Sequence, residues 1–218
     1  MDQIKSDLNY EEMKRQEKRE ACKSASVQYI LLCVSSILGI IIGMFVVLSS
    51  LFYRLLIGYL GLSLYFWLAV SFINCIFYGV VLCTLKKHER GFLTAGLTYI
   101  FYMILYSLGR FAFENEWVGT LLMFAGLIFG IIYTYNLVAS TGDILYGVNN
   151  RLAYAWDTYR KFITVLLSVS IGSLLLFLVP VINLIAAAVV LILGIVLIFI
   201  NIWQIILLIL TTVALRKF

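Results

Sequence analysis

Charged residues are scarce in this sequence. Only 12% of its 218 residues are charged and 63% are hydrophobic, whereas a soluble domain usually carries about 25% charged residues. A water-soluble fold of this size could not remove so much apolar surface from water. Lipid solvates apolar side chains directly, and in lipid the backbone must satisfy its own hydrogen bonds. The composition therefore predicts an all-α integral membrane protein.

Histidine and proline are nearly absent. Pro180 is the single proline, which argues against a loop-rich or disordered chain. His88 is the single histidine, and without a second histidine or a cysteine pair nearby it fits no common zinc site. The sequence contains no phosphate-binding loop, and no carboxylate lies in the middle of an apolar run. We therefore expect no catalytic residue, no metal site and no cofactor, and we expect that the protein is not an enzyme.

The four cysteines do not predict a disulfide framework. Cys22, Cys33, Cys75 and Cys83 lie in apolar runs or in the polar N-terminal segment, and none falls in an expected outer loop. We interpret them as small buried apolar residues.

The apolar residues fall into runs long enough to cross a bilayer. A helix needs about 20 residues to span a hydrocarbon core of about 30 Å. On this basis we expect a charged N-terminal segment, 1–27, followed by a membrane domain, 28–218, with a cytoplasmic loop at 140–161. The boundary between the last two spans rests on Pro180 and Asn183, which are typical of a turn. The expected spans are 28–52, 56–85, 92–113, 117–139, 162–180 and 184–213.

Basic residues orient these spans. With six crossings, only Arg54 and Arg110 of the 16 lysines and arginines fall on the side opposite the N-terminus. Cytoplasmic loops are enriched in Lys and Arg, so we expect a multi-pass protein of the cell membrane with both termini in the cytoplasm. The net charge of +5 is concentrated at the ends of apolar runs, where it faces anionic lipid rather than nucleic acid. The lipid bilayer is therefore an expected partner, and nucleic acid is not.

The segment before the fifth span has an amphipathic pattern. Leu152, Trp156 and Tyr159 recur at helical spacing, and Trp and Tyr favour the headgroup zone. The pattern predicts a cytoplasmic interfacial helix that runs into the fifth span. It anchors that span or, as a sharper alternative, couples or gates the bundle. Either Asn149 or Asn150 is suited to cap its start.

Small residues indicate where the spans pack against one another. Helices in lipid associate through close packing, which small side chains permit. The residues expected at these contacts are Gly39, Gly43, Gly126, Gly130 and Gly194.

Polar and aromatic side chains form a candidate seam between helices. Hydroxyl and amide groups in hydrocarbon require partners, so the seam either lines a polar cavity or holds helices together by hydrogen bonds. For Arg110, which Glu114 follows one turn later, the alternatives are an ion pair at the interface and a charged outer vestibule. The candidate seam consists of Trp67, Ser71, Asn74, Tyr78, Tyr99, Tyr102, Tyr106, Arg110, Asn201 and Gln204.

Two functions are compatible with these features. The first is a small permease, channel or transporter subunit that uses the candidate seam as a pathway. The second is a non-catalytic scaffold or accessory subunit that docks another membrane protein or a second copy of itself. A polar cavity along the seam favours the first function, and a filled bundle with an exposed groove of small residues favours the second.

Overall fold

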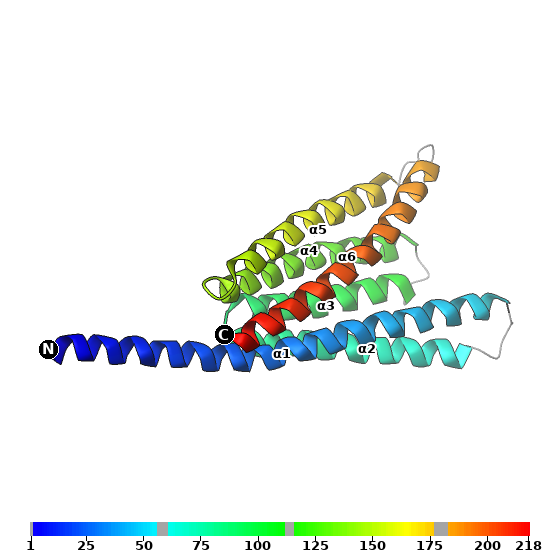
Figure 1. The fold of residues 1–218 in the computed structure, drawn as a ribbon. Helices are drawn as coiled ribbons and strands as arrows, with labels where there is room; N and C mark the ends of the chain where they lie inside the picture. Colours follow the sequence, from blue (N-terminus) through cyan, green and yellow to red (C-terminus); the bar gives the residue numbers. More distant parts are fainter. Residues whose placement is uncertain (1, 56–60, 112–115, 177–182) are drawn as a thin grey trace.

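The computed structural model describes residues 2–55, 61–111, 116–176 and 183–218. These residues form a bundle of six α-helices with one short 3-10 helix, and no strand occurs in the described ranges. Successive helices alternate in direction, so both ends of the chain lie at the same end of the bundle (Figure 1). We call this the termini end. The elements are α1 (Asp2–Leu55), α2 (Gly61–Thr84), η1 (Leu85–Lys87), α3 (Gly91–Phe111), α4 (Glu116–Leu145), α5 (Asn150–Leu176) and α6 (Asn183–Lys217).

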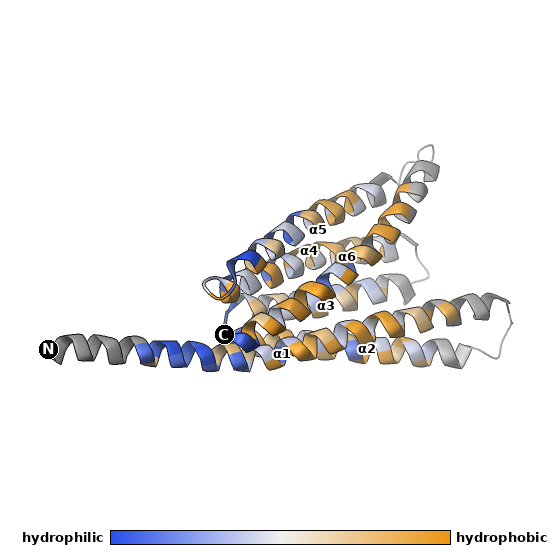
Figure 2. Cartoon of the chain, in the orientation of Figure 1, coloured by the Kyte–Doolittle hydropathy of each residue, from blue (hydrophilic) through white to orange (hydrophobic). Residues whose placement is uncertain are grey.

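Five of these helices are long and apolar enough to cross a membrane. Large apolar side chains also cover the outside of the bundle, and Figure 2 shows hydrophilic residues concentrated at the termini end. Of the described residues, Ile73, Leu121 and Phe199 are each about two-thirds exposed. The candidate segments are Glu12–Val46, Tyr65–Lys87, Gly91–Gly109, Trp117–Leu145 and Ile198–Lys217.

The expected loop at 140–161 is mostly helical. Helix α4 continues to Leu145 and α5 already begins at Asn150. Between them the chain reverses through Gly147, whose φ of 78° suits glycine. The side chain of Asn149 then accepts a hydrogen bond from the backbone N–H of Leu152 at 3.1 Å, which caps the new helix. The turn expected around Pro180 lies outside the described residues.

The segment expected to be an interfacial helix is continuous with the fifth helix, as predicted, but its apolar face is buried. Residues 150–163 form the first turns of α5, and their apolar face packs against other helices of the bundle. Leu152, Trp156 and Tyr159 are 7%, 0% and 3% exposed. The indole N–H of Trp156 donates to the hydroxyl of Thr211 on α6 at 2.9 Å. A partner inside the bundle removes the reason for the indole to seek the wet interface.

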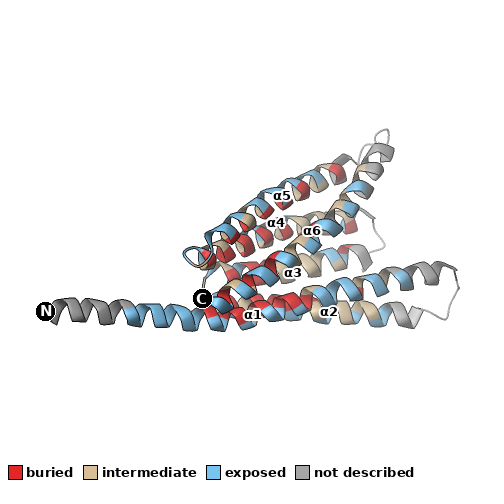
Figure 3. Cartoon of the chain, viewed as in Figure 1, coloured by how far each residue is buried: buried red, intermediate tan, exposed pale blue. Residues whose placement is uncertain are grey.

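The charged N-terminal segment is a continuous part of α1. Residues 12–21 are exposed, and this part of the helix extends past the bundle (Figure 3). Among the described side chains of α1, the first that is buried is that of Cys22.

Glycines permit the closest helix crossings, and these glycines include some that the sequence analysis did not single out. A Cβ on Gly126 of α4 would lie 3.2 Å from the backbone nitrogen of Tyr106, whereas a Cβ on Gly43 would meet nothing within 4 Å. Gly194 lies among the residues whose side-chain surroundings are not described. The sequence reading missed Gly96, where a Cβ would lie 2.6 Å from the carbonyl oxygen of Gly79. At that crossing the backbones of α2 and α3 are in direct contact.

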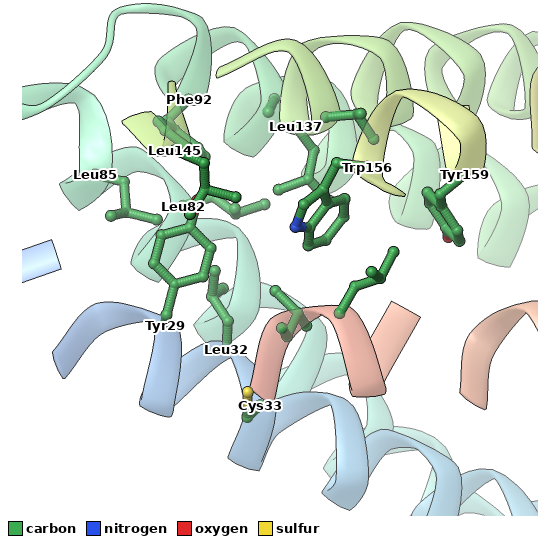
Figure 4. Close-up of a cluster of buried hydrophobic side chains, with 14 of the residues drawn as sticks. Tyr29, Leu32, Cys33, Leu82, Leu85, Phe92, Leu137, Leu145, Trp156 and Tyr159 are labelled. Carbon is green, nitrogen blue, oxygen red and sulfur yellow. The ribbon is translucent and has the colours of Figure 1, made fainter. Parts of the chain in front are cut away.

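The tightest packing lies toward the termini end. The side chains there come from all six helices and are almost completely inaccessible, as Figure 4 shows in close-up. Two hydrogen bonds across helices reinforce the packing, from Tyr29 to Thr141 at 2.8 Å and from Trp156 to Thr211. We call these residues the closed layer: Tyr29, Leu32, Leu82, Leu85, Phe92, Leu137, Leu145, Trp156, Leu208 and Leu215.

Candidate functional site

A cavity of about 470 Å³ lies in the middle of the bundle, and all six helices contribute to its lining. This volume is within the range of small-molecule pockets. The lining carries many hydrogen-bonding groups, and none of the described lining residues is Asp, Glu, Lys, Arg or His. The polar lining residues are Ser35, Ser36, Ser71, Asn74, Tyr78, Tyr99, Tyr102, Tyr133, Thr134, Tyr159, Asn201 and Gln204.

Helical periodicity brings these residues to one place. Side chains three or four positions apart share a face of a helix. Asn74 and Tyr78 on α2 are spaced in this way, and so are Tyr99 and Tyr102 on α3. On each helix, a residue of the closed layer lies one or two turns from the lining, on the side of the termini end. On α1 Leu32 precedes the first lining residue, Ser35. The cavity is thus closed on that side.

Gln204 of α6 joins three other helices at the cavity wall. Its Nε2 donates to the hydroxyls of Tyr78 and Tyr133, each at 3.3 Å. Its Oε1 accepts from the hydroxyl of Tyr159 at 3.1 Å. The hydroxyls of Tyr78 and Tyr133 are themselves 3.0 Å apart. One amide therefore links α6 to α2, α4 and α5.

A second polar contact joins α1 to α2. Ser35 Oγ donates to Asn74 Oδ1 at 2.9 Å, and Asn74 Nδ2 donates to the carbonyl oxygen of Ser35 at 3.1 Å. Gly39 leaves the room that this amide requires, because a Cβ there would lie 3.3 Å from Asn74 Nδ2. The pair holds α1 and α2 together at the edge of the cavity.

Tyrosine rings fill the wall between these two contacts. The ring of Tyr99 lies 4.8 Å from that of Tyr78 and 4.9 Å from that of Tyr133, centroid to centroid. These tilted arrangements suit the ring quadrupoles. The rings form a rigid wall, and their hydroxyls can each donate or accept a hydrogen bond.

Most of the candidate seam lines the cavity, and two of its described members do not. Trp67 instead stacks on Phe45, with 4.5 Å between ring centroids. Tyr106 is 39% exposed and contacts the ring of Tyr102 from outside the lining. The side chain of Arg110 lies outside the described residues. The members in the lining are Ser71, Asn74, Tyr78, Tyr99, Tyr102, Asn201 and Gln204.

Sequence reasoning missed two tyrosines of the network. Tyr133 lies seven residues after Gly126, on the same helix face, so the glycine pattern of α4 could have predicted it. Tyr159 was expected at the lipid headgroups, yet its hydroxyl reaches Gln204. Tyr159 lies on the apolar stripe of α5 and also belongs to the polar network, and its spacing in the sequence is the same for both roles.

Metal chemistry has no candidate in the part of the chain that the structure describes, because no group of three or more His, Cys, Asp or Glu side chains is placed to hold an ion there. Comparison with protein-family models, with curated proteins and with solved structures finds no match for this chain. The function is therefore inferred from the cavity itself.

Proposed function

We propose that this chain is an integral membrane protein that crosses the bilayer six times and provides passage for a small, uncharged, polar solute through its central cavity. The observation that carries the proposal is a polar lining, contributed by all six helices and closed at one end, in which none of the described residues is Asp, Glu, Lys, Arg or His. It is non-catalytic in this reading.

Placement in the membrane is supported by the surface of the bundle. Five helices meet the length and hydropathy that a span requires. Helix α5 lies alongside α4 (Figure 1), and its Phe162 and Val165 are 57% and 64% exposed. These exposed apolar groups favour lipid around α5 as well, which makes the sixth crossing.

The orientation follows from the cations at the termini end. Lys86, Lys87 and Arg90 lie between α2 and α3, and Arg216 and Lys217 end α6. Positive residues favour the cytoplasmic side. In this placement the closed layer faces the cytoplasm.

The character of the solute follows from the cost of burying charge. A charged solute in a low-dielectric cavity needs an opposite charge, and the described lining provides none. A neutral solute that carries several hydroxyl or amide groups, in contrast, can exchange its hydrogen bonds to water for hydrogen bonds to the hydroxyls and amides of the lining. Polyols and small amides have this chemistry.

Uptake into reconstituted vesicles tests the proposal. We expect the protein to accelerate the entry of glycerol or urea but not of sodium or chloride. Replacing Gln204 by Leu should reduce this entry about tenfold, which corresponds to one net hydrogen bond to the solute or to the wall. A protein that moves none of a panel of neutral and charged solutes would contradict the proposal.

Asn136→Leu is the matched control. It removes an amide of a similar kind, but the amide of Asn136 bonds to its own helix, at the carbonyl oxygen of Ile132 at 2.8 Å, and does not line the cavity. Solute entry should be unchanged. An equal loss in both variants would show that the effect of Gln204 is general destabilisation.

The alternative function is a scaffold or accessory subunit that docks a partner. The part of α1 that extends past the bundle favours it, since residues 12–21 are exposed and carry both charges. Under this alternative, the purified protein transports nothing and co-purifies stoichiometrically with another membrane protein or as a homo-oligomer. Substitution of the charged residues in 12–20 would then abolish co-purification, whereas Gln204→Leu would not.

A further inference from the structure

A second, smaller pocket lies at the termini end, apart from the central cavity. It has a volume of about 280 Å³, and its walls come from α1, from the residues around η1 and from the end of α4. On α1, three small residues line it beside Lys18, namely Ala21, Cys22 and Ala25. The space between these elements is therefore available to a ligand.

Cations dominate the rim of this pocket. Lys18 and Lys87 line it together with a single carboxylate, Asp143. The Nζ of Lys18 is held near the turn after α4, because a Cβ on Gly147 would lie 3.3 Å from it. Among the described residues, neither lysine forms an ion pair with a carboxylate. The ammonium of Lys18 also lies 5.4 Å from the ring centroid of Phe218, a cation–π contact that does not neutralise its charge. Both lysines therefore keep a positive charge that an anion can pair with.

His88 lines the pocket and, in the described part of the chain, has one hydrogen-bonding atom without a partner. The Nε2 atom of His88 is buried and has no hydrogen-bond partner among the described residues. Burial, and then the neighbouring Lys87 ammonium, lower the pKa of His88, so the imidazole is neutral near pH 7 and can donate one ring N–H. A buried polar atom without a partner is costly unless a ligand or water satisfies it.

We propose that this pocket binds a phosphate-bearing anion, and that its source is the headgroup of an anionic phospholipid. Lys18 and Lys87 would neutralise the phosphate, and the His88 ring N–H would donate to one of its oxygens. The depth fits a headgroup, because one candidate span ends at Lys87 and the next begins at Gly91. The cytoplasmic leaflet, to which the termini end is assigned above, carries anionic lipid.

Lipid as the source rests on the membrane placement proposed above, but not on solute passage. The two proposals therefore fail separately. If the protein binds phosphatidylglycerol selectively and transports no solute, only the proposal of solute passage is contradicted. If the protein conducts glycerol and shows no preference for phosphatidylglycerol, only the proposal of the lipid site is contradicted.

The test measures phosphatidylglycerol bound to the full-length detergent-purified protein by native mass spectrometry, against phosphatidylcholine. Lys18→Gln and Lys87→Gln should each weaken phosphatidylglycerol binding about fivefold, the usual contribution of one basic residue near a charged membrane surface. Lys86→Gln is the matched control, because it removes the same charge from the adjacent position but does not line the pocket. Its affinity should remain within about twofold of the unsubstituted protein.

Two further arms sharpen the result. His88→Leu should weaken binding, whereas His88→Gln, which keeps an N–H donor, should retain most of it. Displacement of phosphatidylglycerol by inorganic phosphate would assign the site to a soluble phosphate, and resistance to it would assign the site to the lipid. Equal losses in Lys86→Gln and Lys87→Gln, with unchanged thermal unfolding, would overturn the proposal in favour of diffuse surface attraction.

Discussion

The closed layer and the central cavity lie one or two helical turns apart and use the same residue types differently. In the closed layer, Tyr29 and Trp156 are each 0% exposed, and each donates one hydrogen bond to a threonine on another helix. At the cavity, Tyr78, Tyr133 and Tyr159 share one amide and face open space. The difference teaches that polar groups are isolated in pairs where the bundle is filled, and are gathered into a network where it is hollow.

The largest effect is expected in the closed layer, for Trp156→Ala. Truncating a buried tryptophan costs about 3–5 kcal/mol, and the hydroxyl of Thr211 would lose its partner. We expect a marked fall in unfolding temperature in detergent, measured by tryptophan fluorescence or calorimetry. An equal loss of stability in Tyr102→Ala, which removes a ring from the cavity wall, would contradict the distinction between the filled closed layer and the hollow cavity.

Gly96→Ala probes the contact of α2 and α3 between the two zones. The added methyl would lie 2.6 Å from the carbonyl oxygen of Gly79, so the backbones must separate. Overpacking of this kind costs about 1–3 kcal/mol. Gly43→Ala is the control, because its methyl would meet nothing within 4 Å. Thermal unfolding of the two variants should differ clearly, and equal values would contradict the close crossing.

Gln204→Leu should have a smaller effect on stability than on function. It removes the three bonds through which α6 reaches α2, α4 and α5, at an average of about 0.6 kcal/mol for each bond between membrane helices. We therefore expect a loss of about 1–2 kcal/mol in unfolding free energy alongside the loss of solute entry. A loss as large as that of Trp156→Ala would mean that the network is structural and would weaken the proposed passage.

The smallest effect is expected outside both zones, at Asp157. Its carboxylate pairs with Lys161 at 2.8 Å and with Arg160, and the hydrogen bond from Lys161, ahead of the charge of Arg160, lowers its pKa. A lowered carboxyl pKa contributes stability above its unfolded pKa, and this contribution is lost as the pH falls through the folded value. The pair is exposed, so Asp157→Asn should cost less than about 0.5 kcal/mol at neutral pH and nothing in strong acid or high salt.

The helices could be predicted well from the sequence, and so could the cap of α5, since Asn149 was one of the two expected caps. The extent and surroundings of the helix ends could not. Runs of apolar residues require only a count, whereas the start of α5 at Asn150 depends on a cap at Asn149 and on a partner for Trp156 at Thr211. The sequence pattern of Leu152, Trp156 and Tyr159 is the same for a helix against lipid headgroups and for a helix against protein. Only the packing of α6 distinguishes them.

The residues of the cavity could be predicted in part, but the cavity itself could not. Stripes on α2 and α3 follow from helical spacing, so Asn74, Tyr78 and Tyr99 could be assigned to one seam from sequence. Which stripe faces which, and whether space remains between them, depends on the crossing of Gly79 with Gly96 and on the position of α6. These are contacts between segments far apart in the chain, and no local pattern records them.

In the proposed passage, the neutrality of the described lining would limit the forces that act on a solute. Without an acid or a base beside the solute, a proton gradient has nothing to protonate, and without a charge on the solute the membrane voltage does no work on it. Movement would then follow the solute's own concentration difference and stop when the two sides are equal.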